Sequence, residues 1–452
     1  MRQDLTASQY ARALGQADQW PLHTMRMELA FGRPVRITGG PRGVGPLYLR
    51  DRDTSLDGSW DVLDLDPDPT NLDEREAAAY LAYRPRYSST TLFRGVCRLT
   101  ERATAVWSPS AGLTVNYPEP ALHSKPRVLR EDADPVAAFT DLLRQEIAAR
   151  PLPADQCAVE LSGGMDSTMT ALSLAETVGP AHAAALILGG SVGGQQTSRR
   201  REIIQRAGLG SDVTVPVEEC APFLPDGARA TGQVISPMDG TYAEAMTVLY
   251  QRLAACGVRW LLTGIGGDEL CFQRPEERLR SGDPWNVHPV PDHLGPRARA
   301  HLPYLTDALA PASVLHASTV ATIGVHSATA MRRGLWPISP LATPLLLRFS
   351  ESLPHEWRRD KELMRRRLQA AGYSPHVVRP RLPENFSDTC ERAMLRYGRP
   401  LLDRLIPDLL LTKAGLIDSG RLATQCAQVA ATGKRASELY RPLALEASLR
   451  AL

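Results

Sequence analysis

The feature that most constrains the fold is residues 159–168, where an apolar run meets Ser162-Gly163-Gly164 and then a helical pattern. This order predicts a buried strand, a glycine turn and the first turn of a helix. Glycines let the backbone turn with its N–H groups pointing inward, and a helix N-terminus adds partial positive charge. A lone Ser-Gly-Gly would indicate only a capped turn. The full string instead predicts a cradle for a phosphate or pyrophosphate, with Asp166 placed to hold the accompanying Mg²⁺.

Strands and helices alternate from residue 157 onward. The predicted strands cover residues 157–161, 183–188, 213–217 and 258–263, and the predicted helices cover 166–178, 199–207 and 241–256. This alternation predicts an α/β fold, a parallel sheet with helices on both faces, in which ligands bind at the carboxyl ends of the strands. We therefore count Leu188, which ends the second strand, among the nucleotide-binding residues.

A second glycine-containing strand end lies at residues 263–269, Thr-Gly-Ile-Gly-Gly-Asp-Glu. We expect it beside the first motif at one edge of the sheet. Each motif brings one aspartate, Asp166 and Asp268, and two carboxylates on one Mg²⁺ leave coordination sites for ATP phosphates. Alone, the acidic pair at 268–269 would indicate only an acidic helix N-terminus. Neither a GxxxxGKS/T loop nor a GxGxxG fingerprint is present, so kinase-type and dinucleotide-binding functions lose their main support.

The length of 452 residues predicts two to three domains. Residues 1–125 look β-rich, with one helix at 72–81, and a polar, proline-containing connection at 118–126 predicts a linker. Residues 126–452 form the second predicted domain, mostly helical from residue 304 onward. Residues 274–299 are rich in Pro, Gly, Arg and Asp and predict a mobile loop over the edge of the sheet.

Composition excludes several classes of function. The formal net charge of +2 gives no argument for nucleic-acid binding. The seven cysteines occur singly, without the spacing of zinc ligands, as in a reduced, cytoplasmic protein. No signal peptide opens the chain and no apolar run is long enough to span a membrane, so we expect neither a membrane nor a nucleic acid as partner.

The two glycine motifs resemble those of a known family. Residues 162–167 look like the pyrophosphate loop of the ATP-pyrophosphatase superfamily, and residues 263–269 resemble the asparagine synthetase B and β-lactam synthetase branch, which includes lasso-peptide cyclases. Residues 91–99 resemble the segment that closes the family's N-terminal glutaminase-like domain. Residues 360–366 resemble its C-terminal lysine segment.

The resemblance implies a fold, cofactors and site residues. It implies an ATP-pyrophosphatase domain with a helical C-terminal part, preceded by a reduced, non-catalytic glutaminase-like domain. It also implies ATP and Mg²⁺: a substrate carboxylate attacks the α-phosphorus of ATP, and an amine then displaces AMP to form an amide. By their match to family motifs, Lys361 and Asp268 are expected to be catalytic, and Asp166 and Asp268 to bind the metal. The expected nucleotide-binding residues are Ser162, Gly163, Gly164, Asp166, Ser167, Leu188, Gly264 and Gly266.

Three departures from the family concern the source and the activation of the amine that displaces AMP. Family members that hydrolyse glutamine carry a cysteine after the initiator methionine, whereas Arg2 stands here. Ile265 and Trp336 replace the Tyr–Glu dyad with which β-lactam synthetases deprotonate a poorly nucleophilic amide. An ordinary α-amine, with a pKa near ~8, needs little such help. We therefore expect an amine supplied by the substrate itself, hence intramolecular closure, and a larger, more apolar pocket that suits a peptide; plain core packing of Ile265 and Trp336 is the alternative.

The sequence thus predicts an ATP-dependent, AMP-forming amide synthetase that closes a macrolactam in a ribosomal peptide, similar to lasso-peptide cyclases. The expected partners are a peptide or small-molecule carboxylate substrate and a leader peptidase or precursor-binding protein. One alternative is an intermolecular amide ligase, or an enzyme resembling β-lactam synthetases, in small-molecule biosynthesis. A tRNA-modifying enzyme would usually add a basic RNA-binding module or paired cysteines, and neither is found. A non-catalytic binding partner would not need Asp166, Asp268 and Lys361.

Overall fold

A five-stranded parallel sheet forms the centre of the computed structural model, which describes residues 24–41, 45–272, 289–382 and 384–452 and a few isolated residues nearer the N-terminus. The strand order is β10-β9-β8-β11-β12. The strands are β8 (Cys157–Glu160), β9 (His182–Ile187), β10 (Asp212–Pro216), β11 (Trp260–Leu262) and β12 (Trp336–Ile338). This order makes β8 the central strand and β11 its neighbour, as the two glycine motifs require.

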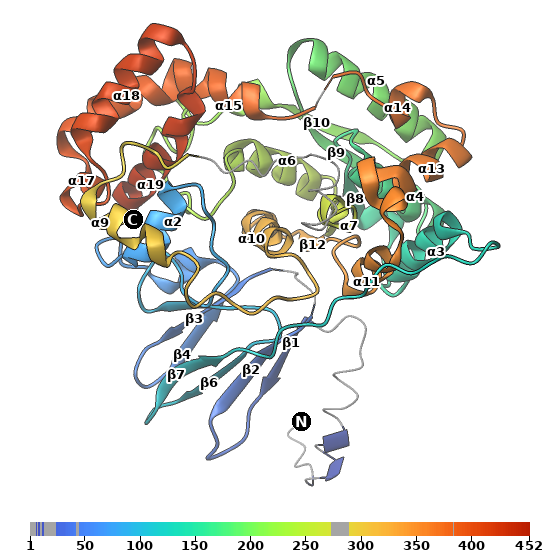
Figure 1. The fold of residues 1–452 in the computed structure, drawn as a ribbon, viewed down its shortest axis with the longest axis horizontal. Coiled ribbons are helices and arrows are strands. Elements are labelled where there is room, and N and C mark those ends of the chain that lie inside the picture. The colour runs from blue at the N-terminus through green and yellow to red at the C-terminus, as the bar shows by residue number, and fades with distance from the viewer. Residues whose placement is uncertain are drawn as a thin grey trace.

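Helices cover both faces of the sheet (Figure 1). One face packs against α3 (Pro135–Ala148), α4 (Met165–Thr177), α5 (Gly190–Ala207), α11 (Pro344–Ser352) and α13 (Glu362–Ala370). The other face packs against α6 (Ala243–Ala255) and α10 (Ala317–Met331). Cys157 and Val159 of β8 join the first core and Ala158 joins the second, and all three are fully buried. A strand covered on both sides reads as a continuous apolar run, which explains the sequence pattern.

Sequence periodicity located most of these elements. All four predicted strands and the helices predicted at 166–178 and 241–256 are present within about three residues of their expected ends. Helix α5, predicted at 199–207, begins much earlier, at Gly190. Glycine weakens a helical pattern in sequence, but Gly193 is needed here because a Cβ would lie 1.7 Å from the carbonyl oxygen of Leu188. Strand β12 was not predicted, because Pro337 reads as a break; β12 is an edge strand, where proline is tolerated.

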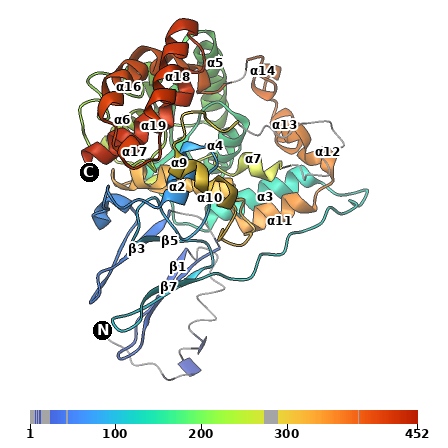
Figure 2. The ribbon, with the colours of Figure 1, turned by 60° about the vertical axis from the view of Figure 1, so that its left-hand side comes forward.

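Two antiparallel sheets form the N-terminal part of the chain (Figures 1 and 2). The four-stranded sheet contains β1 (Met25–Glu28), β2 (Val35–Gly39), β6 (Thr104–Ser108) and β7 (Gly112–Asn116). The three-stranded sheet contains β3 (Leu47–Asp51), β4 (Leu56–Ser59) and β5 (Val96–Leu99). Residues from both sheets share one apolar core, which includes Ile37, Leu49 and Ala105.

The N-terminal helix α2 (Glu74–Leu81) packs on C-terminal helices rather than on these sheets alone. Asp73 caps it by accepting hydrogen bonds from the N–H groups of Arg75 and Glu76. Its buried face shares a core with α18 (Ser419–Thr432) and α19 (Tyr440–Ala451). Figures 1 and 2 show these C-terminal helices on the opposite side of the molecule from α13 and α14 (Pro375–Val378). Helix α2 of the N-terminal region and the C-terminal helices therefore share one core.

The other C-terminal elements are short. They are α12 (His355–Arg358), α15 (Ser387–Ala393), a π-helical turn at Met394–Gly398, α16 (Arg399–Leu405) and α17 (Leu410–Lys413). None of the helices in the described ranges has the length and apolar character needed to cross a bilayer.

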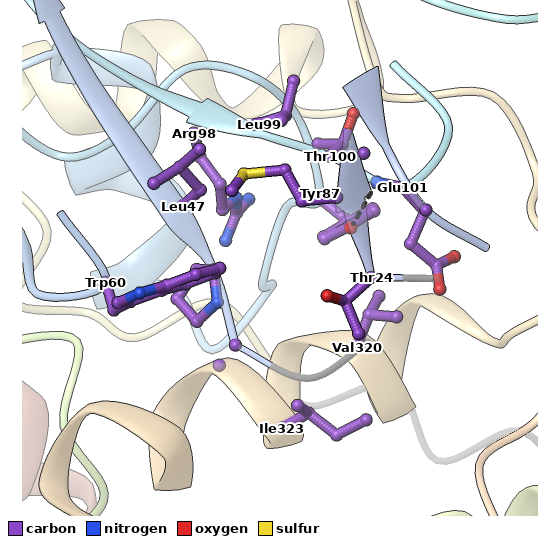
Figure 3. A pocket seen from close by; sticks show the side chains of 16 residues that line it. Thr24, Leu47, Trp60, Tyr87, Arg98, Leu99, Thr100, Glu101, Val320 and Ile323 are labelled. Carbon is purple, nitrogen blue, oxygen red and sulfur yellow. Dashed lines mark hydrogen bonds between the residues drawn. The ribbon is translucent and has the colours of Figure 1, made fainter. Parts of the chain in front are cut away.

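The predicted linker is held against the second half of the chain. Residues 117–130 have no regular secondary structure. The N–H of Ala121 donates to the carbonyl of Ala312 at 2.8 Å, and the N–H of Arg127 donates to the carbonyl of Ser352 at 2.9 Å. A small cavity of about 50 Å³ lies where Leu47, Trp60 and Arg98 of the N-terminal region face Val320 and Ile323 of α10 (Figure 3).

The loop predicted at 274–299 needs correction. Residues 273–288 lie outside the described residues, as does Arg2. The remainder is partly helical, since α9 spans Pro296–His301. Leu294 and Ala298 are buried in the core shared by α2 and the C-terminal helices. This part of the predicted loop is therefore packed structure, and its prolines and arginines form a helix start and surface contacts.

Candidate active site

The two glycine motifs lie side by side at the carboxyl edge of the sheet. Strands β8 and β11 pair in parallel, with Val159 opposite Leu262. The phosphate loop (residues 162–167) follows β8 directly, and the second motif (residues 264–269) follows β11. The structure therefore brings together the residues that the sequence predicted to meet at this edge.

The phosphate loop has the backbone shape of an anion cradle. Gly163 has φ of +91°, a conformation that other residues adopt only with strain. The Ser162 hydroxyl accepts a hydrogen bond from the N–H of Gly164 at 3.2 Å and lies 3.1 Å from the Ser167 hydroxyl. No side chain caps α4, which begins at Met165. The first turn of α4 can thus offer its N–H groups and its partial positive charge to a phosphate.

Glycines of the second motif bring it into direct contact with the phosphate loop. A Cβ on Gly264 would lie 2.6 Å from the backbone nitrogen of Ser167, and a Cβ on Gly267 would lie 2.3 Å from Cγ of Asp166. Gly266 faces the other way: its φ is +100°, and a Cβ there would lie 2.8 Å from the nitrogen of Ala342. Glycine is therefore required at 264 and 267 so that Asp166 can sit against the second motif.

Lys361 joins both aspartates in a cluster that we call the Lys–Asp–Asp cluster. Its Nζ lies 2.7 Å from Oδ1 and 2.6 Å from Oδ2 of Asp166, and 2.6 Å from Oδ1 of Asp268. The side chains of Lys361 and Asp166 are about one-fifth exposed, whereas that of Asp268 is 81 % exposed. Two carboxylates from two strand ends thus converge on one cation, and the cluster keeps one net negative charge.

Burial and mutual charge set the protonation of the cluster. Burial raises the pKa of Asp166 to about 6; Lys361 opposes this shift and Asp268 adds to it. Burial alone would lower the pKa of Lys361, but the two carboxylates outweigh it and hold that pKa above its ordinary value. Near neutral pH, Lys361 is therefore a cation and the carboxyl group of Asp166 is mostly ionised.

The backbone that presents Lys361 is strained. Asp360 (φ 52°, ψ 25°) and Lys361 (φ 58°, ψ 35°) are consecutive left-handed residues just before α13. This conformation costs a residue with a Cβ roughly 1 kcal/mol or more. Arg365 holds the turn, because its Nε donates to the carbonyl of Asp360 at 2.7 Å and its guanidinium also binds the carbonyl of Val378. This left-handed turn places the Lys361 ammonium at the edge of the sheet, in contact with Asp166 and Asp268.

Gln196 of α5 ties the phosphate loop to β9. Its Nε2 donates to the carbonyls of Ser162 and Leu186, each at 3.0 Å, and its Oε1 accepts from the N–H of Leu188 at 2.9 Å. The Gln196 side chain is buried. Leu188 therefore follows the last residue of β9, but its N–H is already bonded and its side chain is packed in the core beside α6.

A carboxylate also lies beside the phosphate loop. Glu384 Oε2 would be 3.7 Å from a Cβ at Gly163. The buried Arg199 holds this carboxylate at 2.7 Å, and Gln195 donates to Glu384 Oε1 at 3.0 Å. Helix α5 thus fixes the chain segment that borders the cradle.

The two positions that depart from β-lactam synthetases lie at different ends of their strands. Ile265 follows the carboxyl end of β11, whereas Trp336 begins β12, opposite Trp260. The Trp336 ring packs edge-on against Trp60, with centroids 6.2 Å apart. Both residues border the main core. For Trp336, packing against the core and against Trp60 accounts for the side chain.

Comparison with protein families agrees with this geometry. Residues 138–317 match the asparagine synthase family. The matched residues make up less than half of the chain. The match supports an ATP-dependent carbon–nitrogen ligase with ATP as its nucleotide. A search among curated proteins found no match.

The matched region, residues 138–317, contains the phosphate loop and the second motif but ends before Lys361. The place of Lys361 in the site therefore depends on the contacts of its Nζ. Sequence reasoning missed Gln196, Gly267 and Asp360. Gly267 could have been found, because it is the third glycine within residues 264–267. Nothing in a single sequence reveals the buried hydrogen bonds of Gln196 or the left-handed conformation of Asp360.

Proposed function

We propose that the chain is an ATP-dependent, AMP-forming amide synthetase that closes a macrolactam in a linear peptide. The observation that carries the proposal is the convergence of Asp166, Asp268 and Lys361 beside an open helix N-terminus. This arrangement suits a reaction in which a substrate carboxylate attacks the α-phosphorus of ATP and pyrophosphate leaves.

The donor set fits Mg²⁺. Asp166 and Asp268 already hold one cation, the Lys361 ammonium, so their oxygens converge on a single point. No group of three or more metal-binding side chains occurs in the described part of the chain. A pair of carboxylates leaves the remaining octahedral positions to phosphate oxygens and water, as Mg²⁺ bound with ATP requires. When bound there, the metal would neutralise charge on the departing pyrophosphate.

The residues of the chain then have distinct tasks. The N–H groups of the first turn of α4 bind the phosphates, and Ser162 and Ser167 add hydroxyl donors. Lys361 supplies positive charge to the reacting carboxylate and α-phosphate. Asp166 and Asp268 would hold the metal. A carboxylate oxygen is a poor leaving group until it carries AMP, after which an amine displaces AMP and forms the amide.

The N-terminal sheets offer no thiolate for glutamine hydrolysis. Cys97 is the first cysteine of the sequence, and burial and the charge of Asp51 raise the pKa of its thiol. A neutral, half-buried thiol is a poor nucleophile. This supports an amine that belongs to the substrate, and hence ring closure within one molecule.

A direct test incubates the protein with ATP, Mg²⁺ and linear peptides that carry a free α-amine and one internal Asp or Glu. The expected products are AMP, pyrophosphate and a peptide lighter by one water, detected by mass spectrometry. Asp166→Ala should abolish all three, and Asp141→Ala, at an exposed carboxylate of α3, should not. If AMP forms only when small amino acids and a separate amine are supplied, the protein is an intermolecular ligase and does not close a macrolactam.

A further inference from the structure

A groove of about 1060 Å³ opens between α15 and α18. One wall contains Tyr242, Phe386 and Ser387, and the opposite wall is one face of α18. The groove is larger than the usual pocket for a single small molecule. It shares Thr241 and Tyr440 with a second cavity of about 260 Å³ that extends toward the N-terminal sheets.

The groove is connected to the proposed adenylation site by the chain segment that contains Glu384 and Phe386. Glu384 borders Gly163 of the phosphate loop, and Phe386 of the groove wall follows two residues later. Tyr242 fixes this segment, since its hydroxyl donates to the carbonyl of Phe386 at 2.5 Å and the two rings lie 5.0 Å apart. Tyr242 also precedes α6, which runs back toward the start of β11, so the first turn of α6 is on the carboxyl side of the sheet.

The α18 wall is a polar stripe at helical spacing. Arg421, Thr424, Gln425 and Gln428 follow one another at intervals of three, one and three residues and all line the groove. This spacing places them on one face of the helix. Arg421, Thr424 and Gln428 are exposed, while Leu422, Cys426 and Val429 face the core. The stripe can therefore offer hydroxyl and amide groups to a ligand without disturbing the packing of α18.

The other groups of the groove suit a peptide with an acidic side chain. Tyr242, Phe386 and Tyr440 present aromatic surface. Arg435 is already paired with Glu438 at 2.6 Å, whereas the exposed Arg421 is 3.6 Å from Asp418, so its guanidinium can also meet a carboxylate of a ligand. Amides and hydroxyls can pair with peptide N–H and C=O groups, and aromatic rings can cover apolar side chains.

From this juxtaposition we infer that the groove binds the linear peptide whose carboxylate is activated, with the peptide extending from Tyr242 and Phe386 along α18. The inference rests on the proposed function and adds a location for the substrate. It predicts that binding depends on the stripe of α18, which lies outside the nucleotide-binding residues.

The test places a bulky side chain inside and outside the groove on the same helix. Thr424→Trp and Gln428→Trp fill the groove, and Ala427→Trp, at an exposed position of α18 that does not line it, is the matched control. The probe is a fluorescein-labelled pool of linear peptides with a free α-amine and one internal Asp or Glu, read by anisotropy. We expect the two groove variants to weaken binding at least tenfold, with Ala427→Trp and the ATP affinity of every variant unchanged.

The outcomes separate the two proposals. Equal peptide binding and turnover in all variants would contradict the groove as the peptide-binding site. The proposed macrolactam closure would be unaffected by that result. Absence of peptide binding in the wild type, with AMP formed from small amino acids, would overturn the proposed function and the groove with it. As a second readout, a benzophenone amino acid at position 424 should crosslink to the peptide, and one at position 427 should not.

Discussion

The ammonium of Lys361 contacts both carboxylate oxygens of Asp166, at 2.7 and 2.6 Å, although 195 residues separate them in the sequence. This contact joins the strained turn before α13 to the first turn of α4. The same ammonium reaches Asp268 after β11. One lysine thus connects three segments at the place where ATP chemistry is expected.

Loss of Lys361 should remove adenylation while leaving the fold intact. We expect Lys361→Ala to lower the rate of AMP formation about 100-fold or more, since one preorganised charge at a developing transition state contributes that much. The matched control is Lys413→Ala, because Lys413 also pairs with an aspartate, Asp408, at 2.6 Å but far along the chain and exposed. Similar losses in both variants would show that the effect is not specific to the site.

Gly267 should tolerate no side chain. In Gly267→Ala the new Cβ meets the Asp166 side chain, so we expect thermal unfolding to begin at lower temperature, a loss of about 1–3 kcal/mol, and little AMP formation. Gly194→Ala in α5 is the control, because its Cβ would meet nothing within 4 Å. That variant should keep its activity and gain about 0.5–1 kcal/mol of stability. Full activity of Gly267→Ala would contradict the contact between the motifs.

Gln196 should act by positioning the phosphate loop. Gln196→Leu leaves the buried carbonyls of Ser162 and Leu186 and the N–H of Leu188 without this partner, so we expect a loss of about 2 kcal/mol or more in denaturant unfolding. The KM for ATP should rise more than the peptide KM. Gln205→Leu, at an exposed position of the same helix, provides the comparison. An unchanged KM for ATP would show that Gln196 contributes only to the stability of the fold and does not position the phosphate loop.

Glu101 should make stability fall as the pH rises. Burial raises the pKa of Glu101 to about 8 from an ordinary 4.5, against a hydrogen bond from Ser313 and the charge of Arg102. Between pH 4.5 and 8 the unfolded chain has lost a proton that the folded chain keeps, so the free energy of unfolding decreases across this window and levels off above it. Figure 3 shows this side chain at the rim of the small cavity.

The measurement compares wild type and Glu101→Gln by urea unfolding at pH 5, 7 and 9. The wild type should lose roughly 4 kcal/mol relative to the variant from the lowest to the highest pH, because each pH unit between the unfolded and folded pKa values of Glu101 corresponds to about 1.4 kcal/mol. Glu131→Gln, at an exposed carboxylate, should follow the wild type. Parallel pH profiles for wild type and Glu101→Gln would contradict the buried, protonated carboxyl.

Local sequence patterns were enough to predict the two strand ends that form the site. An apolar run followed by glycines identified β8 and the phosphate loop, and the repeat of this pattern after β11 predicted that the two ends would meet. Both inferences need only the length of an apolar run and the conformational freedom of glycine. The third site residue, Lys361, was located by family resemblance.

Long-range packing decided the rest. The start of α5 depends on the close approach of Gly193 to the carbonyl of Leu188. Strand β12 depends on its pairing with β11 at the edge of the sheet. Helix α9 forms because Leu294 and Ala298 are buried against α2 and the C-terminal helices, a partnership that no local pattern reveals. The left-handed turn at Asp360 is held by Arg365, which overrides the preference of both residues for other conformations.

The central claim, attack of a substrate carboxylate on the α-phosphorus of ATP, is tested most directly by an isotope transfer. A linear peptide is prepared with heavy oxygen in its Asp or Glu side-chain carboxylate and incubated with the protein, ATP and Mg²⁺. The account predicts that one heavy oxygen appears in AMP and that the pyrophosphate contains none. Heavy oxygen in inorganic phosphate, together with ADP, would contradict it.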